Sequence, residues 1–485
     1  MITRQRTGKL SQLPTGKRIV KNFLSLTVAQ FIGNILGFVT TAYLARVFCA
    51  RGFGQISFAQ AVIVYFTLLT DFGLNTLGTR EVARDKEKIK GYVSNILTIQ
   101  ITLAAASFTL LLVFLALINK PMDYKVLIAL FGLSLFSSAF SIDWAFRGIE
   151  RMEFIGIAQI MRSAIYTGLV FLFIKSRSDI FDVPLFNFIA FLTIDAFLIY
   201  SFVRNYGRLS PSFHIRTWKE LLVKAFPMCF SYLMIMIYYH MDTIMLGFMK
   251  GDEVVGWYNA AYKIILLLLG LLGTFFQVLH PVVSYRHKHR QDELGRDLCL
   301  VMKYIILATV PVVFGGMAVA DTLLTLLFGG DFQNGSLAFK ILIWNIGIVG
   351  ISSVYGQLIL LMGAGERDFA IGVTIGGIVN IILNFLLIPK WSLYGAAVAT
   401  VTSEIAVAVY VYRASSKTMK VAWARFMYKP MIASIIMFVV LIQLKHLHLF
   451  VLLPAGIITY GTFLLMLRGI GKKDLAFIRD FFFAR

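Results

Sequence analysis

Long apolar stretches, separated by short polar connections, follow one another along nearly the whole chain. They fall at about residues 22–44, 55–78, 92–118, 126–146, 154–174, 180–203, 221–249, 254–280, 298–328, 341–362, 368–388, 393–412, 430–444 and 449–467. A helix needs about 20 apolar residues to cross the hydrocarbon layer, and nearly all of these stretches reach that length. The pattern predicts an all-α polytopic membrane protein with fourteen transmembrane helices. The stretch at 430–444 is the shortest.

The composition agrees with this class. Hydrophobic residues make up 58% of the chain and charged residues only 15%, with a mean hydropathy of +0.78. The net charge of +21 could suggest a nucleic-acid partner, but the basic residues are scattered among short loops between apolar stretches. Membrane topology therefore explains the charge, and we expect no nucleic-acid partner. The three cysteines lie far apart, so they predict neither a disulfide framework nor a metal site.

Lysine and arginine also set the orientation. With the N-terminus inside, the segments on the cytoplasmic side carry roughly three times as many of these residues as the outer loops. The count predicts a multi-pass membrane protein with both termini cytoplasmic. The connections are short, roughly 17 residues at most, and carry no phosphate-cradling loop, metal cluster or nucleophile elbow. We therefore expect a protein that is not an enzyme and needs no cofactor beyond a coupling cation.

An internal repeat divides the chain. A constant shift lays Gly54–Ala59 over Gly256–Ala261 and aligns the basic residues that follow each segment. Six helices per repeat is an even number, so the two copies keep one orientation in the membrane. The predicted organisation is an N-lobe at 1–203, a cytoplasmic linker at 204–220, a C-lobe at 221–412, and two further helices with a tail at 413–485.

A motif at the end of the second apolar stretch indicates a family. The run Asp71-Phe-Gly-Leu-Asn-Thr-Leu-Gly-Thr-Arg-Glu-Val-Ala-Arg84 leads into a basic loop that ends at Lys90. It resembles the signature of the polysaccharide transporter family, the O-antigen-type oligosaccharide flippases. Their superfamily also holds the lipid II flippases and the multidrug and toxin extrusion transporters. The resemblance implies two six-helix lobes around a central cavity plus two C-terminal helices.

The resemblance also implies a function. A flippase of this kind would move a polyprenyl-(pyro)phosphate-linked oligosaccharide from the cytoplasmic to the outer leaflet by alternating access, coupled to an ion gradient. The alternative is an ion-coupled multidrug exporter of the same superfamily, which would need an acidic cavity. The partners expected are the lipid-linked oligosaccharide and membrane lipids. We expect a monomer, working near glycan polymerase machinery.

Cations inside the apolar stretches are the candidates for binding the phosphates. Each costs roughly 2.5–3.5 kcal/mol at the bilayer centre unless it faces water or a partner. Arg162 and Lys263 are the main candidates; the alternative is that they form ion pairs with acids such as Asp143. Lys303 could instead extend to the membrane interface, and Arg46 could serve substrate release or anchor its helix.

Acids and amides form a second candidate set. Asp242 has no basic neighbour within a helical turn except His240, and Asn380 and Asn384 share one helical face. Thr400 adds a hydroxyl, which completes an oxygen set suited to sodium, while Asp242 alone could take a proton. The resemblance implies the same site, since lipid II flippases have an acid, two polar residues and a hydroxyl on the equivalent spans; Asn384 replaces an acid there. The alternative is that both asparagines join helices by hydrogen bonds. The other intramembrane acids are Asp71, Asp195 and Glu404.

Overall fold

The computed structural model describes residues 15–289, 291–360, 365–417 and 421–469, and over these ranges the protein is helical with no β-strand. The contacts between residues divide the chain into two compact units, Met1–His240 and Met241–Arg485. One long helix, α10, contains the residues at which the first unit ends and the second begins.

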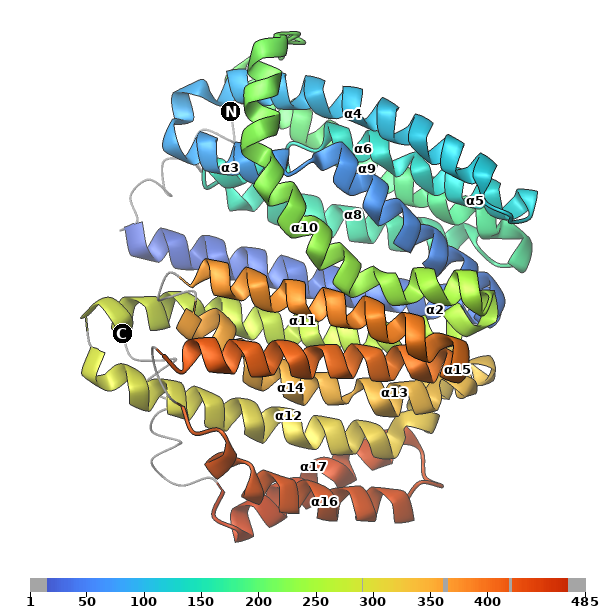
Figure 1. Ribbon diagram of the computed structural model, residues 1–485, viewed down its shortest axis with the longest axis vertical. Helices are drawn as coiled ribbons and strands as arrows, with labels where there is room; N and C mark the ends of the chain where they lie inside the picture. The colour runs from blue at the N-terminus through green and yellow to red at the C-terminus, as the bar shows by residue number, and fades with distance from the viewer. Residues whose placement is uncertain (1–14, 290, 361–364, 418–420, 470–485) are drawn as a thin grey trace. The chain divides into compact units, whose positions relative to one another are not determined.

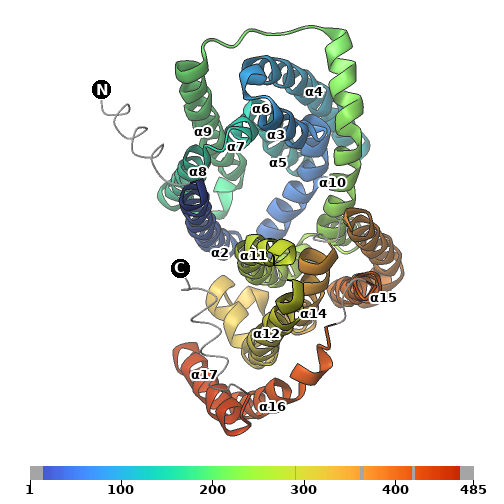
Figure 2. The same ribbon diagram turned by 90° about the vertical axis from the view of Figure 1, so that its left-hand side faces the viewer.

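Unit 1 consists of helices that are mostly apolar along their length. They are α2 (Thr15–Asp71), α3 (Leu74–Arg84), η1 (Lys86–Lys88), α4 (Ile89–Leu117), α5 (Met122–Gly132), α6 (Ser134–Phe140), α7 (Asp143–Gly148), α8 (Met152–Phe173), η2 (Arg177–Phe181), α9 (Asp182–Tyr206) and most of α10 (Ile215–Met249). Side by side in Figure 2 lie α8 and α9, as do α3 and α7. The core of the unit includes Leu74, Leu77, Trp144, Phe146 and Phe202, each at most 1% exposed.

Helix α2 contains a break, which explains why two predicted spans appear as one helix. The apolar part of α2 has 45 residues, about twice what a single crossing needs. Cys49 has a φ of 55° and lies between two helical segments. A left-handed residue cannot continue a right-handed helix, so the chain changes direction there. The connection that the sequence predicted at about residues 45–54 is in fact helical on both sides of one break.

Unit 2 begins within α10 and continues through helices of similar character. They are α11 (Asp252–His289), α12 (Gln291–Phe328), η3 (Gly330–Gly335), α13 (Ser336–Leu342), α14 (Trp344–Ser353), the π-helical turn η4 (Val354–Leu360), α15 (Glu366–Ser415), η5 (Ala424–Phe426), α16 (Tyr428–Gln443) and α17 (Leu449–Met466). The long helix α15 is broken at Ser392, where φ is 53°, three residues after Pro389. The last two helices, α16 and α17, pack against α12 (Figure 1).

The number of helices that could span a membrane differs from the predicted fourteen. In the described part of the chain, eleven helices are long and apolar enough to cross a membrane. The difference has a physical reason: α2 and α15 each count once although a left-handed residue breaks them, and α16 is shorter than the others. The protein is thus an all-helical, multi-pass membrane protein.

Candidate functional site

A buried polar cluster in unit 2 surrounds the carboxylate of Asp242. The hydroxyls of Tyr258 and Thr400 each donate to Oδ2 of Asp242 at 2.6 Å, and the amide nitrogen of Asn384 donates to Oδ1. That same nitrogen donates to Oδ1 of Asn380 at 2.9 Å. Three helices supply the cluster: α10 carries Asp242, α11 carries Tyr258, and the two segments of α15 carry the asparagines and Thr400. The structure therefore brings together all four residues that the sequence proposed for the cation site.

The cluster is excluded from solvent. Asp242 is 1% exposed, both asparagines are fully buried, and Thr400 is 3% exposed. Two polar atoms have no hydrogen-bond partner, Nδ2 of Asn380 and Oδ1 of Asn384. A buried polar atom without a partner costs about 1–3 kcal/mol. The arrangement therefore retains hydrogen-bonding capacity that a further group could use.

Sequence analysis missed Tyr258, which is fully buried and donates to the central carboxylate. The next residue on each of the two helices makes a similar contact: the amide nitrogen of Asn259 donates to the hydroxyl of Thr243 at 3.1 Å. Tyr258 could have been found because it lies in the repeat segment Gly256–Ala261, directly after the helix that carries Asp242.

Arg162 of α8 is the main candidate cation of unit 1. Its guanidinium lies 4.6 Å from the centre of the Phe191 ring, a cation–π contact. Within the described residues no acid forms an ion pair with Arg162, so the structure does not contain the internal ion pair that was the alternative. The two nearby acids attract Arg162 electrostatically but bind elsewhere: Asp195 accepts from Ser137 at 2.7 Å, and Asp143 pairs with Arg147.

Lys263 of α11 is one of the candidate intramembrane cations of unit 2. Its side chain is partly buried, and the described residues offer it neither an ion pair nor a hydrogen bond. Lys303, on α12, is also partly buried, whereas Arg46, on α2 just before the break at Cys49, is exposed.

The remaining intramembrane acids have different surroundings. Asp71 ends α2 and accepts hydrogen bonds from the backbone nitrogens of Gly73 at 3.3 Å and Asn75 at 3.2 Å. Asp195 is 3% exposed, and Glu404 is 8% exposed on the same segment of α15 as Thr400.

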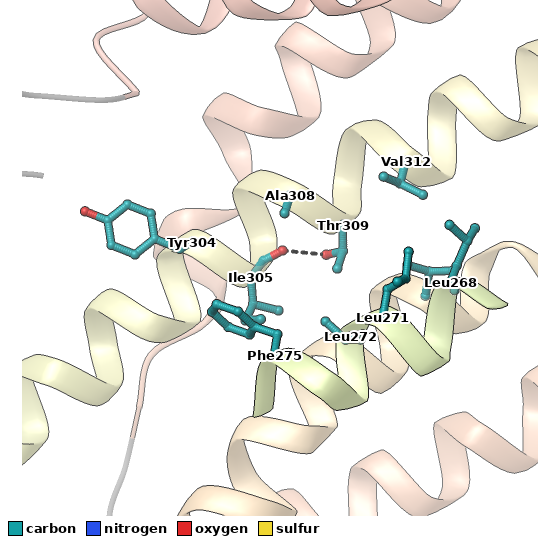
Figure 3. Close-up of a pocket in the computed structure, with 10 residues that line it drawn as sticks. Leu268, Leu271, Leu272, Phe275, Tyr304, Ile305, Ala308, Thr309 and Val312 are labelled. Atoms are coloured by element: carbon teal, nitrogen blue, oxygen red, sulfur yellow. Dashed lines mark hydrogen bonds between the residues drawn. The ribbon is translucent and has the colours of Figure 1, made fainter. Parts of the chain in front are cut away.

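An apolar pocket lies elsewhere in unit 2, between α11 and α12 with one residue from α14. Its volume is about 400 Å³, and Leu268, Leu272 and Phe275 face Ile305 and Thr309 across it (Figure 3). The hydroxyl of Thr309 is bound to the carbonyl of Ile305 and is not free to bind a polar group. The pocket contains none of the candidate site residues and cannot hold a phosphate.

The fold defines a class, the helical multi-pass membrane proteins. Two family models cover most of the chain: "Polysaccharide biosynthesis protein" matches residues 19–287, and "Lipid II flippase MurJ" matches residues 155–461. The chain belongs to the polysaccharide biosynthesis protein family, which confirms the resemblance found in the sequence motif.

Individual relatives agree with this family. A protein of Escherichia coli (strain K12) named "Putative O-antigen transporter" is 24% identical over 396 residues, which are 79% of this chain and 93% of that protein. The "Capsular polysaccharide biosynthesis protein CapF" of Staphylococcus aureus is 22% identical over 409 residues, 81% of this chain and 98% of that protein.

Solved structures share the fold. A lipid II flippase MurJ in an inward closed conformation superposes with a TM-score of 0.75 at 17% identity, covering 93% of this chain and 99% of that chain. An inward-facing multidrug resistance MATE family transporter gives a TM-score of 0.59 at 13% identity, covering 84% of this chain and 98% of that chain.

Proposed function

We propose that this protein is a flippase that moves a polyprenyl-(pyro)phosphate-linked oligosaccharide from the cytoplasmic to the outer leaflet of the membrane. It is a transporter and not an enzyme. The observation that supports this most is family membership, together with relatives named for O-antigen and capsular polysaccharide that match over more than nine tenths of their length. Lipid alone strongly resists the passage of phosphates and sugars, because both would lose their hydration.

The membrane topology we propose has fourteen crossings. Counting each broken helix, α2 and α15, as two crossings and adding α16 to the apolar helices gives this number. We propose that both termini lie in the cytoplasm, which the excess of lysine and arginine on one side supports, and that the protein lies in a bacterial inner membrane. The two lobes supply the moving parts around a central cavity, so one copy of the chain is sufficient for transport.

Arg162 and Lys263 are the residues we propose to bind the phosphates. An unpaired cation in a membrane helix is costly, so its presence calls for a compensating anion. No acid in the described residues pairs with either of them, and a pyrophosphate would supply that anion. Lys303 and Arg46 would assist at the entry to the cavity and at release. Rocking of the two lobes would carry the head group outward while the polyprenyl tail stays in lipid.

The Asp242 cluster is our candidate for coupling to an ion gradient. Its residues fit a small cation: the carboxylate of Asp242, the hydroxyl of Thr400 and the two amide oxygens are the ligand types that hard cations prefer. Oδ1 of Asn384 is a buried acceptor without a partner, and a half-turn of this amide exchanges its oxygen with the nitrogen now facing Asp242. A bound cation, sodium or a proton, would neutralise the carboxylate.

The multidrug exporter remains the second candidate because the MATE fold is similar. A site for cationic drugs would place acids where the substrate rests. Arg162 and Lys263, two candidate cations that form no ion pair within the described residues, would instead favour an anionic substrate.

Reconstitution tests the proposed function. We expect the purified protein in proteoliposomes to move a fluorescent polyprenyl-pyrophosphate-linked disaccharide between leaflets, and Arg162→Ala and Lys263→Ala to slow this by at least about tenfold each. Lys445→Ala removes an exposed cation and is the matched control, with an unchanged rate. Normal flipping by both single variants would refute the phosphate assignment, and failure of the wild-type protein to flip the probe would refute the function.

A further inference from the structure

Helices α8 and α9 run antiparallel, and two contacts define which of their turns face each other. The guanidinium of Arg162 on α8 lies 4.6 Å from the centre of the Phe191 ring on α9. The ring of Phe154 lies 6.4 Å from that of Phe197, centre to centre. As the residue number falls along α8, it rises along α9, so each turn of one helix has a defined partner turn on the other.

Asp195 lies one turn beyond Phe191 on the same face of α9, where the register puts Ala158 of α8 opposite it. Ala158 is 5% exposed and carries only a methyl group. Side chains in a helix point back toward its N-terminus, so the side chain of Arg162 leaves α8 in the direction of Ala158 and Asp195. One helical turn is about 5.4 Å, a distance that a change of arginine rotamer covers.

Arg162 and Asp195 each lack an opposite charge. Asp195 is 3% exposed, and within the described residues only the hydroxyl of Ser137 donates a hydrogen bond to it, at 2.7 Å. The Phe191 ring attracts the guanidinium of Arg162 but does not neutralise it. A charge withdrawn from water is costly without a partner, so a cation and an acid one turn apart would both gain from meeting.

Asp143 is a second acid that attracts Arg162, but its surroundings differ. It forms an ion pair with Arg147, one turn further along α7. The charge of Asp143 is therefore already balanced, whereas the hydrogen-bond donor to Asp195 is a neutral hydroxyl. Asp195 is thus the acid that Arg162 can neutralise without breaking an existing ion pair.

We propose that Asp195 is a positioning residue that competes with the substrate phosphate for Arg162. While the phosphate is bound, the guanidinium stays beside Phe191; as the phosphate leaves, the guanidinium moves one turn along α9 and pairs with Asp195. The carboxylate thereby lowers the affinity for the phosphate and allows its release. This inference rests on the proposed function, because it concerns the anion that Arg162 binds.

Binding of polyprenyl pyrophosphate to the purified full chain, measured by native mass spectrometry, tests the competition through the sign of each effect. Asp195→Asn keeps an oxygen for Ser137 but removes the competing charge, so the pyrophosphate should bind at least fivefold more tightly, and only when Arg162 is present. Ser137→Ala removes the hydrogen-bond donor of Asp195, which leaves the carboxylate more dependent on Arg162, so binding should weaken at least threefold. Asp143→Asn is the matched control and should stay within twofold of wild type.

A merely structural role for Asp195 would give a different result, since damage to the packing weakens binding. Unchanged or weaker binding by Asp195→Asn would overturn the proposal. Tighter binding that persists in Arg162→Ala/Asp195→Asn relative to Arg162→Ala would overturn it as well.

Labelling of arginine with phenylglyoxal tests the pair without any ligand. In nanodiscs, with peptide mass spectrometry reading each site, Asp195→Asn should raise the labelling rate of Arg162 at least threefold, because the guanidinium loses its acid. Arg216, whose side chain is 95% exposed, is the internal reference and should keep its rate. Equal labelling of Arg162 in wild type and Asp195→Asn would overturn the proposal. If the wild-type protein binds the pyrophosphate no better than the polyprenol of equal length, the proposed phosphate role fails, and the labelling still decides whether Arg162 and Asp195 meet.

Discussion

Two intramembrane aspartates, Asp71 and Asp242, lie in opposite kinds of surroundings. Asp71 is bound by the backbone nitrogens that follow it and by the neutral amide of Gln100. The hydrogen bonds to Asp242 come from side chains, Tyr258 on the next helix and Asn384 and Thr400 on a helix distant in sequence. Backbone donors stay where the fold puts them, whereas hydroxyls and amides can turn toward another group. The first acid is suited to holding a shape and the second to exchanging partners.

The largest effect we predict is that of Asp242→Asn on transport. The amide keeps the shape of the carboxylate but removes its charge, so no cation or proton can be coupled through it. Flipping driven by a sodium or proton gradient should fall more than tenfold, with a loss of stability of only about 1–2 kcal/mol from the mismatched hydrogen bonds. Measurement of flipping in proteoliposomes with and without each gradient checks this. Unchanged dependence on both gradients would remove Asp242 from the coupling mechanism.

Asp71→Ala should show the opposite behaviour. It removes the side chain that caps the first turn of α3 and leaves Gln100 short of an acceptor, so we expect a loss of about 1–2 kcal/mol in stability. Thermal unfolding in detergent measures the loss. Flipping per folded molecule should stay within about twofold of wild type, provided the turn after Asp71 keeps its shape. A large transport defect in fully folded protein would make the two acids more alike than we propose.

Tyr258→Phe should have an intermediate effect. It deletes one donor to the Asp242 carboxylate and keeps the ring in place. A single such hydrogen bond to a charged group contributes about 1.5 kcal/mol or more, so the ion concentration for half-maximal flipping should shift roughly tenfold. Tyr262→Phe, on the same helix, is the control for loss of a tyrosine hydroxyl in this region. An identical shift in both variants would mean that the contact to Asp242 is not the cause.

The smallest effect should come from Asp71→Asn. Asparagine caps helices about as well as aspartate, so stability should change by a few tenths of a kcal/mol. The contrast with Asp242→Asn sharpens the comparison, since we expect the same chemical change to be harmless at Asp71 and severe at Asp242. Unfolding and flipping measured side by side on the two variants would show it; a severe transport defect at Asp71 would abolish the distinction.

Much of the Asp242 cluster was predictable because its residues can be recognised from their neighbours along one helix. Asn380 and Asn384 lie on the same face of one helix. Asp242 lies in an apolar stretch with few basic residues nearby, so it needs other polar partners. Tyr258 was not predictable in this way, since an aromatic residue in a membrane helix usually fills space. Its hydroxyl matters here only because packing brings it to Asp242.

The fold was predictable in class and less so in detail. Apolar stretches identify helices, but at Cys49 and Ser392 a single left-handed residue turns the chain, and neither residue type favours that conformation. Tertiary packing must stabilise these turns, and packing is not visible in a hydropathy pattern. In the same way, the sequence shows Gly73 only as a glycine that interrupts an apolar stretch. Its close approach to Ala225 and Cys229 depends on a helix about 150 residues away.

Binding of two tail lipids tests the central claim most directly. Native mass spectrometry can compare the affinity of the purified protein for a polyprenyl pyrophosphate with its affinity for the polyprenol of equal length, which lacks the phosphates. If Arg162 and Lys263 hold the head group, the pyrophosphate should bind at least about tenfold more tightly, and the double variant Arg162→Ala/Lys263→Ala should lose that preference. Equal affinity of the wild-type protein for the two lipids, or an undiminished preference in the double variant, would contradict the account.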